Sequence, residues 1–243
     1  MAKTALITGA SRGIGAAVAE TLAADGYNLS LCCRSSGDRL NALADSLHRR
    51  YGVQVRCALG DVGSCSFARE MTETALAEFG HIDVLVNNAG ISHVGLLTDM
   101  QIEDWEHVMR TNLTSVFSMC RLAAPSMIAR RSGRIINISS VWGRVGAACE
   151  AAYSASKGGM NAFTKAFGKE LAPSGIPVNA VACGAIDTEM NRFLSDEERA
   201  CLTEEIPAGR MGTPEEAAAL VLLLCRAPVY LTGQILTLDG GWT

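Results

Sequence analysis

The chain contains no long apolar run and no cluster of basic residues. Its 243 residues carry a formal net charge of −4, with 21 Lys and Arg against 25 Asp and Glu. Without a basic run, neither nucleic acid nor an anionic membrane is a favoured partner. The first residues read directly into an apolar strand, without the hydrophobic region and cleavage site of a signal peptide, and no segment is long enough to span a bilayer. We therefore expect a soluble, cytoplasmic protein.

Metal-ligand spacing is also missing. The nine cysteines are odd in number and scattered, and they include the adjacent pair Cys32 and Cys33 but no C-x-x-C motif. We interpret them as reduced thiols, most of them in the core. No histidine is spaced with cysteines or acids as in a zinc site; the four are His48, His81, His93 and His107. We therefore expect no bound metal.

Apolar runs alternate with helical patterns along the whole chain, with no linker or repeat between them. A chain of this length, 49% apolar, can bury one large core, so we expect a single domain over residues 1–243. Helical crossovers make successive strands parallel. The prediction is a doubly wound α/β Rossmann fold, a seven-stranded parallel sheet with helices on both faces. The strand candidates are residues 4–8, 28–33, 53–59, 82–87, 134–139, 177–182 and 234–238.

One long stretch, residues 184–212, shows no regular pattern. A connection of that length inside a compact domain is uncommon unless it has a function. We interpret it as a substrate lid.

A glycine-rich segment directly follows the first predicted strand and opens onto an amphipathic helix at Ile14. Its glycines allow the backbone to approach a pyrophosphate, whose charge is favoured at a helix N-terminus. A plain strand-to-helix turn is the alternative, but the position after the first strand favours a dinucleotide site. The predicted cofactor-binding residues here are Gly9, Ser11, Arg12, Gly13, Ile14 and Gly15.

The residue after the second strand indicates which dinucleotide binds. An acidic residue there commonly bonds the ribose of NAD, whereas a basic residue accommodates the 2′-phosphate of NADP. Here it is Arg34, and Arg12 offers a second cation, so NADPH is the expected cofactor. Arg34 as a solvated loop charge is the alternative. Asp61 and Val62, after the third strand, could contact the adenine, although Asp61 could instead be a helix N-cap. A turn close to the cofactor is expected at Asn88, Ala89 and Gly90.

Tyr153 and Lys157 have the i, i+4 spacing that places two side chains on one face of a helix. A free tyrosine titrates near 10, so donating a proton at neutral pH calls for a neighbouring cation that stabilises the phenolate. Lys157 could supply that charge. A surface lysine one turn from an interfacial tyrosine is the alternative, because the spacing is common by chance.

The motifs occur in a fixed order: T-G-A-S-R-G-I-G, N-N-A-G, Asn112, Ile138-Ser139-Ser140 and Y-S-A-S-K. The chain thereby resembles the short-chain dehydrogenase/reductase family over essentially its whole length. It is most similar to the bacterial 3-oxoacyl-acyl-carrier-protein reductases of fatty acid biosynthesis, through G-R-M-G-T-P-E-E-A from Gly209 and L-T-G-Q-I-L-T-L-D-G-G from Leu231.

The resemblance implies a role for each matching residue. Tyr153 would be the general acid and Ser140 would polarise the substrate carbonyl. Lys157 would bind the nicotinamide ribose and lower the tyrosine pKa, and Asn112 would hold a water that links the lysine to solvent. Ile186 and Thr188 would contact the nicotinamide carboxamide and the phosphates.

The chain departs from this pattern at two positions, and a third segment resembles another branch of the family. Cys183 replaces a proline before the lid, which puts the rigidity of the loop in doubt. Arg130 and Arg131 fit a docking site for acyl carrier protein, but Ser174 stands where another basic residue is common. Residues 142–150, W-G-R-V-G-A-A-C-E, resemble a branch that reduces a 5-aminopentanone group on elongation factor P.

Three functions therefore remain open: an NADPH-dependent 3-oxoacyl thioester reductase, a reductase of the aminoketone on elongation factor P, and a non-catalytic dinucleotide-binding scaffold. Glu150 bears on the second, because a carboxylate facing the pocket would attract a substrate ammonium, whereas one in an interface or in solvent would be structural. The family likeness and the apolar helical patterns of residues 111–129 and 153–171 predict a homotetramer.

Overall fold

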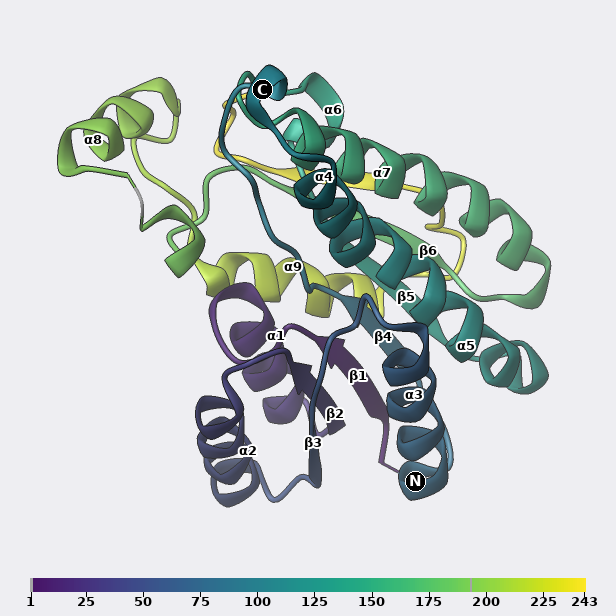
Figure 1. Ribbon diagram of the computed structural model, residues 1–243. Helices are drawn as coiled ribbons and strands as arrows, with labels where there is room; N and C mark the ends of the chain where they lie inside the picture. Colours follow the sequence, from purple (N-terminus) through teal and green to yellow (C-terminus); the bar gives the residue numbers. More distant parts are fainter. Residues whose placement is uncertain (1, 193) are drawn as a thin grey trace.

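The computed structural model describes residues 2–192 and 194–243. Its centre is a parallel sheet with the strand order β3-β2-β1-β4-β5-β6-β7 (Figure 1). Each of the seven strands lies within two residues of its predicted bounds, which confirms the doubly wound fold. The strands are β1 Thr4–Thr8, β2 Asn28–Cys33, β3 Val55–Leu59, β4 Val84–Asn87, β5 Arg134–Ser140, β6 Val178–Cys183 and β7 Ile235–Leu238.

Helices cover both faces of the sheet. One face carries α1 (Gly13–Ala24), α2 (Gly37–Tyr51) and α9 (Pro214–Arg226), and the other carries α3 (Cys65–Phe79), α5 (Ser115–Arg130) and α7 (Ala151–Leu171). The core accordingly has two halves. Within β1, Ala5 and Ile7 belong to the first half and Leu6 to the second, because successive side chains of a strand point to opposite faces.

Shorter elements lie in the connections between these strands and helices. They are α4 (Ile102–Met109), α6 (Trp142–Val145), α8 (Asp196–Glu205), a π-turn η2 (Arg110–Thr114) and three 3₁₀ turns, η1 (Leu97–Asp99), η3 (Ala172–Ser174) and η4 (Glu189–Asn191).

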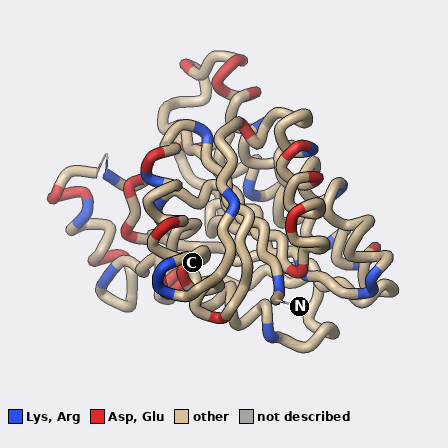
Figure 2. The backbone as a smooth tube through the Cα atoms, turned by 90° about the horizontal axis from the view of Figure 1, so that it is seen from below, with Lys and Arg blue, Asp and Glu red and all other residues tan. Residues whose placement is uncertain are grey.

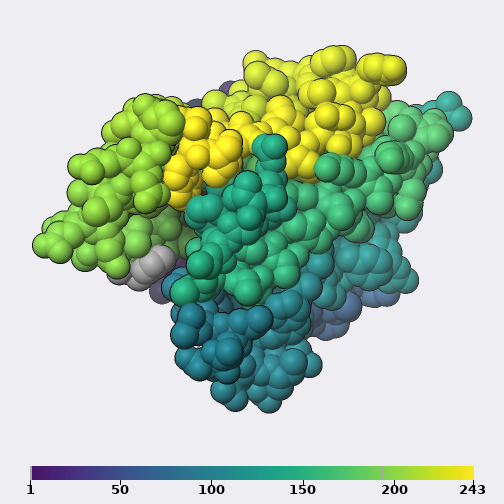
Figure 3. Space-filling model, turned by 90° about the horizontal axis from the view of Figure 1, so that it is seen from above, coloured from purple at the N-terminus to yellow at the C-terminus, as the bar shows by residue number. Residues whose placement is uncertain are grey.

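The predicted lid, residues 184–212, is not irregular throughout, because it contains η4 and α8. The start of α8 is set locally: Ser195 and Glu198 form a capping box that satisfies the first amide groups of the helix. No residue of α8 is buried, and the segment stands out from the body of the molecule beside the C-terminal residues (Figures 1 and 3). Its role as a lid stays a prediction, and Phe193 lies outside the described residues.

Charge is dispersed over the surface. Figure 2 shows basic and acidic segments interspersed along the backbone, without a broad face of one sign. No helix within residues 2–192 and 194–243 is long and apolar enough to cross a membrane. All nine cysteines are free thiols, and five of them are buried, Cys32, Cys33, Cys120, Cys183 and Cys225.

Candidate active site

The site lies where the strand order changes direction. β1 is flanked by β2 on one side and β4 on the other, and the chain leaves β1 and β4 toward opposite halves of the sheet. The loops that follow these two strands part at this point, which is where open α/β sheets bind their ligands. They are the glycine-rich segment and the Asn88–Ala89–Gly90 turn.

The glycine-rich segment has the close backbone packing that a dinucleotide site requires. Gly9 and Gly13 have φ of +66° and +54°, conformations that favour glycine. A Cβ on Gly15 would lie 2.3 Å from the Gly9 carbonyl oxygen, so no side chain fits there. Arg12 is the N-cap of α1, whose first turn holds no acidic residue and whose amide groups can receive an anion. The segment therefore fits the pyrophosphate of a nicotinamide dinucleotide.

The turn after β4 is fastened to the glycine-rich segment. Asn88 Nδ2 donates to the carbonyl oxygens of Thr8 and Gly9, each at 3.0 Å, and the amides of Asn88 and Ala89 both donate to Thr8 Oγ1 at 3.0 Å. A Cβ on Gly90 would lie 3.4 Å from Lys157 Nζ. These hydrogen bonds agree with the prediction that the turn lies beside the cofactor. They also show that the Asn88 side chain holds the turn against the glycine-rich segment.

Asp61 is not a helix N-cap. Its Oδ1 accepts from the Gly63 amide at 2.8 Å, which closes a turn within the loop, and the N-cap of α3 is Ser64. Val62 is 6% exposed and packs into the core half that contains α3 and α5. The alternative for Asp61 is wrong because three further residues separate it from the first residue of the helix, Cys65.

The two arginines assigned to the 2′-phosphate have different partners. Arg12 Nη1 lies 3.0 Å from Glu189 Oε2 of the lid, and Arg39 Nη1 of α2 lies 2.7 Å from Glu189 Oε1. These arginines lower the pKa of the Glu189 carboxyl, first through the Arg39 hydrogen bond. Arg34 instead lies 3.0 Å from His107 Nε2. Sequence reasoning missed Arg39, Glu189 and His107, since nothing local to each of them marks these contacts.

Tyr153 and Lys157 share one face of α7, as their spacing predicts. Lys157 Nζ lies 5.6 Å from the centroid of the Tyr153 ring and donates to the Ile138 carbonyl oxygen at 2.7 Å. The lysine is 3% exposed, and burial lowers its pKa to about 8. The alternative interpretation of Lys157 as a surface lysine is therefore wrong.

The pKa of Tyr153 does not follow the sequence argument. Burial raises it, the Ser140 hydrogen bond opposes that rise, and the nearby Glu150 charge adds to it. Lys157 was expected to lower this pKa, but the lysine amine is directed to the Ile138 carbonyl, and desolvation of the phenol dominates. The phenol is therefore protonated at neutral pH, which suits a proton donor.

Ser140 is the last residue of β5, so the strand end aims it at the site. Its Oγ accepts from the Trp142 amide at 3.2 Å, and the Ser140 hydroxyl is near enough to Tyr153 to lower the pKa of the phenol. The preceding Ser139 hydroxyl donates to Asn161 Oδ1 of α7 at 2.7 Å. Ser140 and Tyr153 are thus held together by a packed strand and helix.

Asn112 lies in the π-turn η2 and is fully buried. Its amide exchanges hydrogen bonds with the backbone of Ile91, at 2.9 Å to the Ile91 amide and 2.8 Å to its carbonyl, and donates to Ser156 Oγ at 3.0 Å. The Asn112 carbonyl oxygen has a second lone pair. That lone pair agrees with the expected water-holding role without establishing it.

The start of the lid is anchored at β6. The Cys183 carbonyl accepts from the Val141 amide at 2.9 Å, and the Gly184 amide donates to the Leu238 carbonyl at 2.9 Å. Burial raises the pKa of the Cys183 thiol to about 12, so the thiol is neutral beside Lys157. Backbone hydrogen bonds therefore hold the chain at Cys183, where the family pattern has a proline.

Ile186 and Thr188 differ in placement. The Ile186 side chain is 4% exposed and packs in the core. The Thr188 methyl group lies 3.4 Å from where a Cβ on Gly13 would stand, so the lid covers the start of α1. The predicted phosphate contact of Thr188 is consistent with this position.

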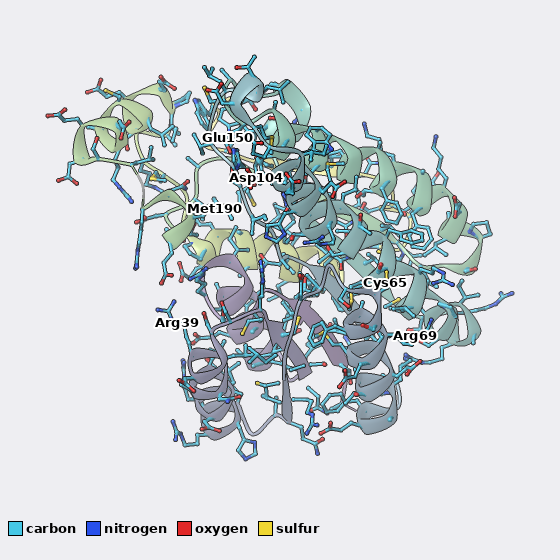
Figure 4. The ribbon with its side chains drawn as sticks, in the orientation of Figure 1. Arg39, Cys65, Arg69, Asp104, Glu150 and Met190 are labelled. Atoms are coloured by element: carbon cyan, nitrogen blue, oxygen red, sulfur yellow. The ribbon has the colours of Figure 1, made fainter. Side chains whose placement is uncertain are left out.

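Glu150 lies at the opposite end of the site from Arg39 (Figure 4). It immediately precedes α7 but caps it with no side-chain bond; instead its Oε2 accepts from Ser92 Oγ at 2.5 Å. The loop around it is held to the chain after β4, because the Gly95 amide donates to the Cys149 carbonyl at 2.8 Å. Among the salt bridges between described residues, none involves Glu150.

Arg130 and Arg131 do not border this site within a single chain. Arg130 Nη2 lies 2.8 Å from Asp83 Oδ1, and Asp83 also accepts from the Thr4 amide at the first residue of β1. They therefore lie at the amino-terminal edge of the sheet, whereas the site lies at the carboxyl edge. α5 runs back along the sheet before it ends, which separates these arginines from the site within one chain. Docking of acyl carrier protein at Arg130 and Arg131 stays a prediction.

Comparison with known proteins identifies the family. The model of the short chain dehydrogenase family matches residues 3–199. The chain belongs to that family. A short-chain dehydrogenase is expected to use a nicotinamide dinucleotide, and the glycine-rich segment described above fits one.

Several relatives of this short-chain dehydrogenase match it over nearly its whole length. It is 42% identical to the uncharacterized oxidoreductase YmfI of Bacillus subtilis, with 100% of this chain and 99% of that protein covered. It is also 42% identical to the 3-oxoacyl-[acyl-carrier-protein] reductase FabG of Escherichia coli, covering 98% and 96%. The crystal structure of a gluconate dehydrogenase candidate from Agrobacterium tumefaciens superposes with a TM-score of 0.92 at 36% identity, covering 99% of this chain and 95% of that one.

Proposed function

We propose that this short-chain dehydrogenase is a cytoplasmic, NADPH-dependent ketone reductase whose substrate is a 3-oxoacyl thioester on acyl carrier protein. The arrangement of Ser140, Tyr153 and Lys157 carries the proposal, because it joins a carbonyl-polarising hydroxyl, a neutral phenol and a buried amine. Seven relatives named 3-oxoacyl-[acyl-carrier-protein] reductase, at 41–42% identity, favour the thioester.

The chain's own residues perform the acid-base part of the reduction. Ser140 donates a hydrogen bond to the substrate carbonyl oxygen, and Tyr153 gives that oxygen its phenolic proton as the alkoxide charge develops. Lys157 and Asn112 line the path by which the Tyr153 phenolate regains a proton. When bound, NADPH supplies the hydride to the carbonyl carbon. Gly9, Gly13 and Gly15 would hold its pyrophosphate, and Lys157 its nicotinamide ribose.

A second candidate is reduction of a 5-aminopentanone group on elongation factor P. Glu150 favours it, because this carboxylate is near enough to raise the Tyr153 pKa and no described cation neutralises it. A substrate ammonium would pair with such a charge. The relatives named for the thioester keep this candidate second.

Parallel assays separate the candidates. NADPH oxidation is followed with a 3-oxoacyl thioester and with a short cationic aminoketone, on wild type and on Glu150→Gln. We expect the thioester to be the better substrate and to be insensitive to the substitution. Selective loss of aminoketone turnover in Glu150→Gln would favour the second candidate. No oxidation with any activated ketone would point to a non-catalytic dinucleotide-binding scaffold.

A further inference from the structure

The short helix α6 contacts two residues of the candidate active site through its backbone. The Trp142 amide donates to Ser140 Oγ at 3.2 Å. A Cβ on Gly143 would lie 2.6 Å from the Lys157 carbonyl carbon, and the Gly143 carbonyl oxygen accepts from Asn161 Nδ2 at 3.1 Å. α6 therefore lies directly against α7 and against the end of β5, so a displacement of α6 would move Ser140 relative to Lys157.

A helix as short as α6 does not hold its position by itself. None of its four residues, Trp142–Val145, is buried. A single helical turn is unstable in isolation, because its few hydrogen bonds do not compensate for the loss of backbone freedom. Contacts with other parts of the chain must therefore hold α6 in place.

The C-terminal residues 239–243, here called the C-terminal turn, supply such a contact. The Trp242 ring packs edge to face against the Trp142 ring, with 4.8 Å between the ring centroids and 62° between the ring planes. Aromatic rings prefer this arrangement, which stabilises by more than the area that it buries. Figure 1 shows the C-terminal end of the chain beside α6. β7 adds a hydrogen bond to α6, from Arg144 to Thr237 Oγ1.

Asp239 fixes the shape of the C-terminal turn. Its carboxylate accepts from the Gly241 amide at 3.0 Å and from the Thr243 amide at 2.9 Å. Gly240 and Gly241 have φ of +67° and +87°, conformations that favour glycine. The carboxylate and the two glycines thus hold Trp242 against α6.

The C-terminal turn also contacts both ends of the predicted lid. The Ala208 amide, near the end of the lid, donates to the Gly240 carbonyl oxygen at 3.1 Å. A Cβ on Gly184, the first residue of the lid, would lie 2.7 Å from Asp239 Cβ. In Figure 3 the yellow C-terminal residues lie against the light green lid. One short segment therefore joins the lid to the helix that contacts Ser140.

We propose that Trp242 is a positioning residue for Ser140. Through the Trp142 ring it holds α6 where the Trp142 amide donates to the serine oxygen. A hydroxyl has one hydrogen to donate and two lone pairs. Because the amide occupies a lone pair, the Ser140 hydrogen is free for the phenol or for the substrate carbonyl. The proposal rests on the proposed role of Ser140 in ketone reduction.

Steady-state kinetics of Trp242 variants test the proposal. Reduction of a 3-oxoacyl thioester is measured on wild type, Trp242→Ala, Trp242→Phe and Tyr230→Ala. We expect Trp242→Ala to lower kcat about tenfold, because a small displacement of a reacting group is costly, while the KM for NADPH changes less than about twofold. Trp242→Phe keeps an aromatic ring and should recover most of kcat. Tyr230→Ala removes an aromatic side chain that is 99% exposed before β7, and it is the control.

Hydrogen exchange provides a readout that needs no substrate. In Trp242→Ala the amides of Trp142 and Ala208 should exchange about two- to tenfold faster than in wild type, while those of α9 stay unchanged. Unchanged exchange at Trp142 would overturn the proposal, because Trp242 would then not hold α6. Faster exchange with an unchanged kcat would overturn it too, because α6 would then not position Ser140. If Trp242→Ala does not fold, Trp242→Leu takes its place.

Ser140→Ala separates this proposal from the proposed function. If Ser140→Ala lowers kcat and Trp242→Ala does not, the positioning role fails and the reductase stands. If wild type reduces no activated ketone, the proposed function fails and the positioning role fails with it. In the double variant, loss of Trp242 should cost little beyond Ser140→Ala, because it acts through that serine. An undiminished further loss would make Trp242 merely structural.

Discussion

Replacing Lys157 by Met should change how the stability of the protein depends on pH. The amine is 3% exposed, and burial holds its pKa at about 8, against 10.5 for a free lysine. Between these two values the unfolded chain binds a proton on Lys157 that the folded chain does not. Stability therefore rises with pH across this range, because the unfolded state loses its proton there.

The size of the effect follows from the shift. One pKa unit corresponds to about 1.4 kcal/mol, so the interval from about 8 to 10.5 corresponds to about 3 kcal/mol in the free energy of unfolding. The cost of burying the charged amine is fully present below pH 8 and disappears as the pH rises. Lys157→Met removes that cost and should be the more stable protein, relative to wild type, at pH 7.

Urea unfolding at fixed protein concentration, from pH 7 to pH 10, measures the difference. We expect the advantage of Lys157→Met over wild type to shrink by about 2–3 kcal/mol over this range. Groups that both proteins share cancel, and Cys183 stays protonated because burial raises its pKa to about 12. Lys165→Met is the control, since Lys165 is exposed on the same helix and loses little solvation on folding.

A pH-independent difference between Lys157→Met and wild type would refute the reasoning. It would mean that the folded protein keeps the amine solvated, contrary to its contact with the Ile138 carbonyl at 2.7 Å. The same slope in Lys165→Met would show that the effect belongs to surface charge and not to burial.

Three further predictions concern turnover, the cofactor loop and assembly. Tyr153→Phe should lower kcat by roughly 10²–10⁴ in the reductase assay while nucleotide affinity by titration stays near wild type; unchanged turnover would assign the proton to another group. Gly15→Ala should lower stability by about 1–3 kcal/mol and weaken dinucleotide binding, because its Cβ would lie 2.3 Å from the Gly9 carbonyl oxygen. Gly37→Ala is the control and should melt like wild type, because the nearest atom to its added Cβ would be 3.6 Å away. Light scattering should give about four times the chain mass of 25.6 kDa. Phe117 of α5 is 49% exposed, and Phe117→Glu should lower the measured mass. A wild-type monomer at micromolar concentration would contradict the tetramer.

Much of the fold follows from local pattern. Short, largely apolar runs between helical patterns suffice to locate the strands, because strands inside a parallel sheet are covered by helices on both faces. The helix α8 was not expected; it has a capping signal at Ser195 and Glu198 but no apolar face, so periodicity alone could not reveal it.

Some features of the candidate site could be predicted from the sequence, and others depend on the tertiary structure. The sequence by itself determined the glycine-rich segment and the helical face of Tyr153 and Lys157, because each depends on residues close together in the chain. It also determined the family, through the order of short motifs along the whole chain. The tertiary structure alone decided which charges meet. Arg12 is paired with Glu189, 177 residues away, and Arg34 is placed beside His107. It also decided that burial, and not the lysine, dominates the pKa of Tyr153, since desolvation depends on what packs around a group rather than on its neighbours in sequence.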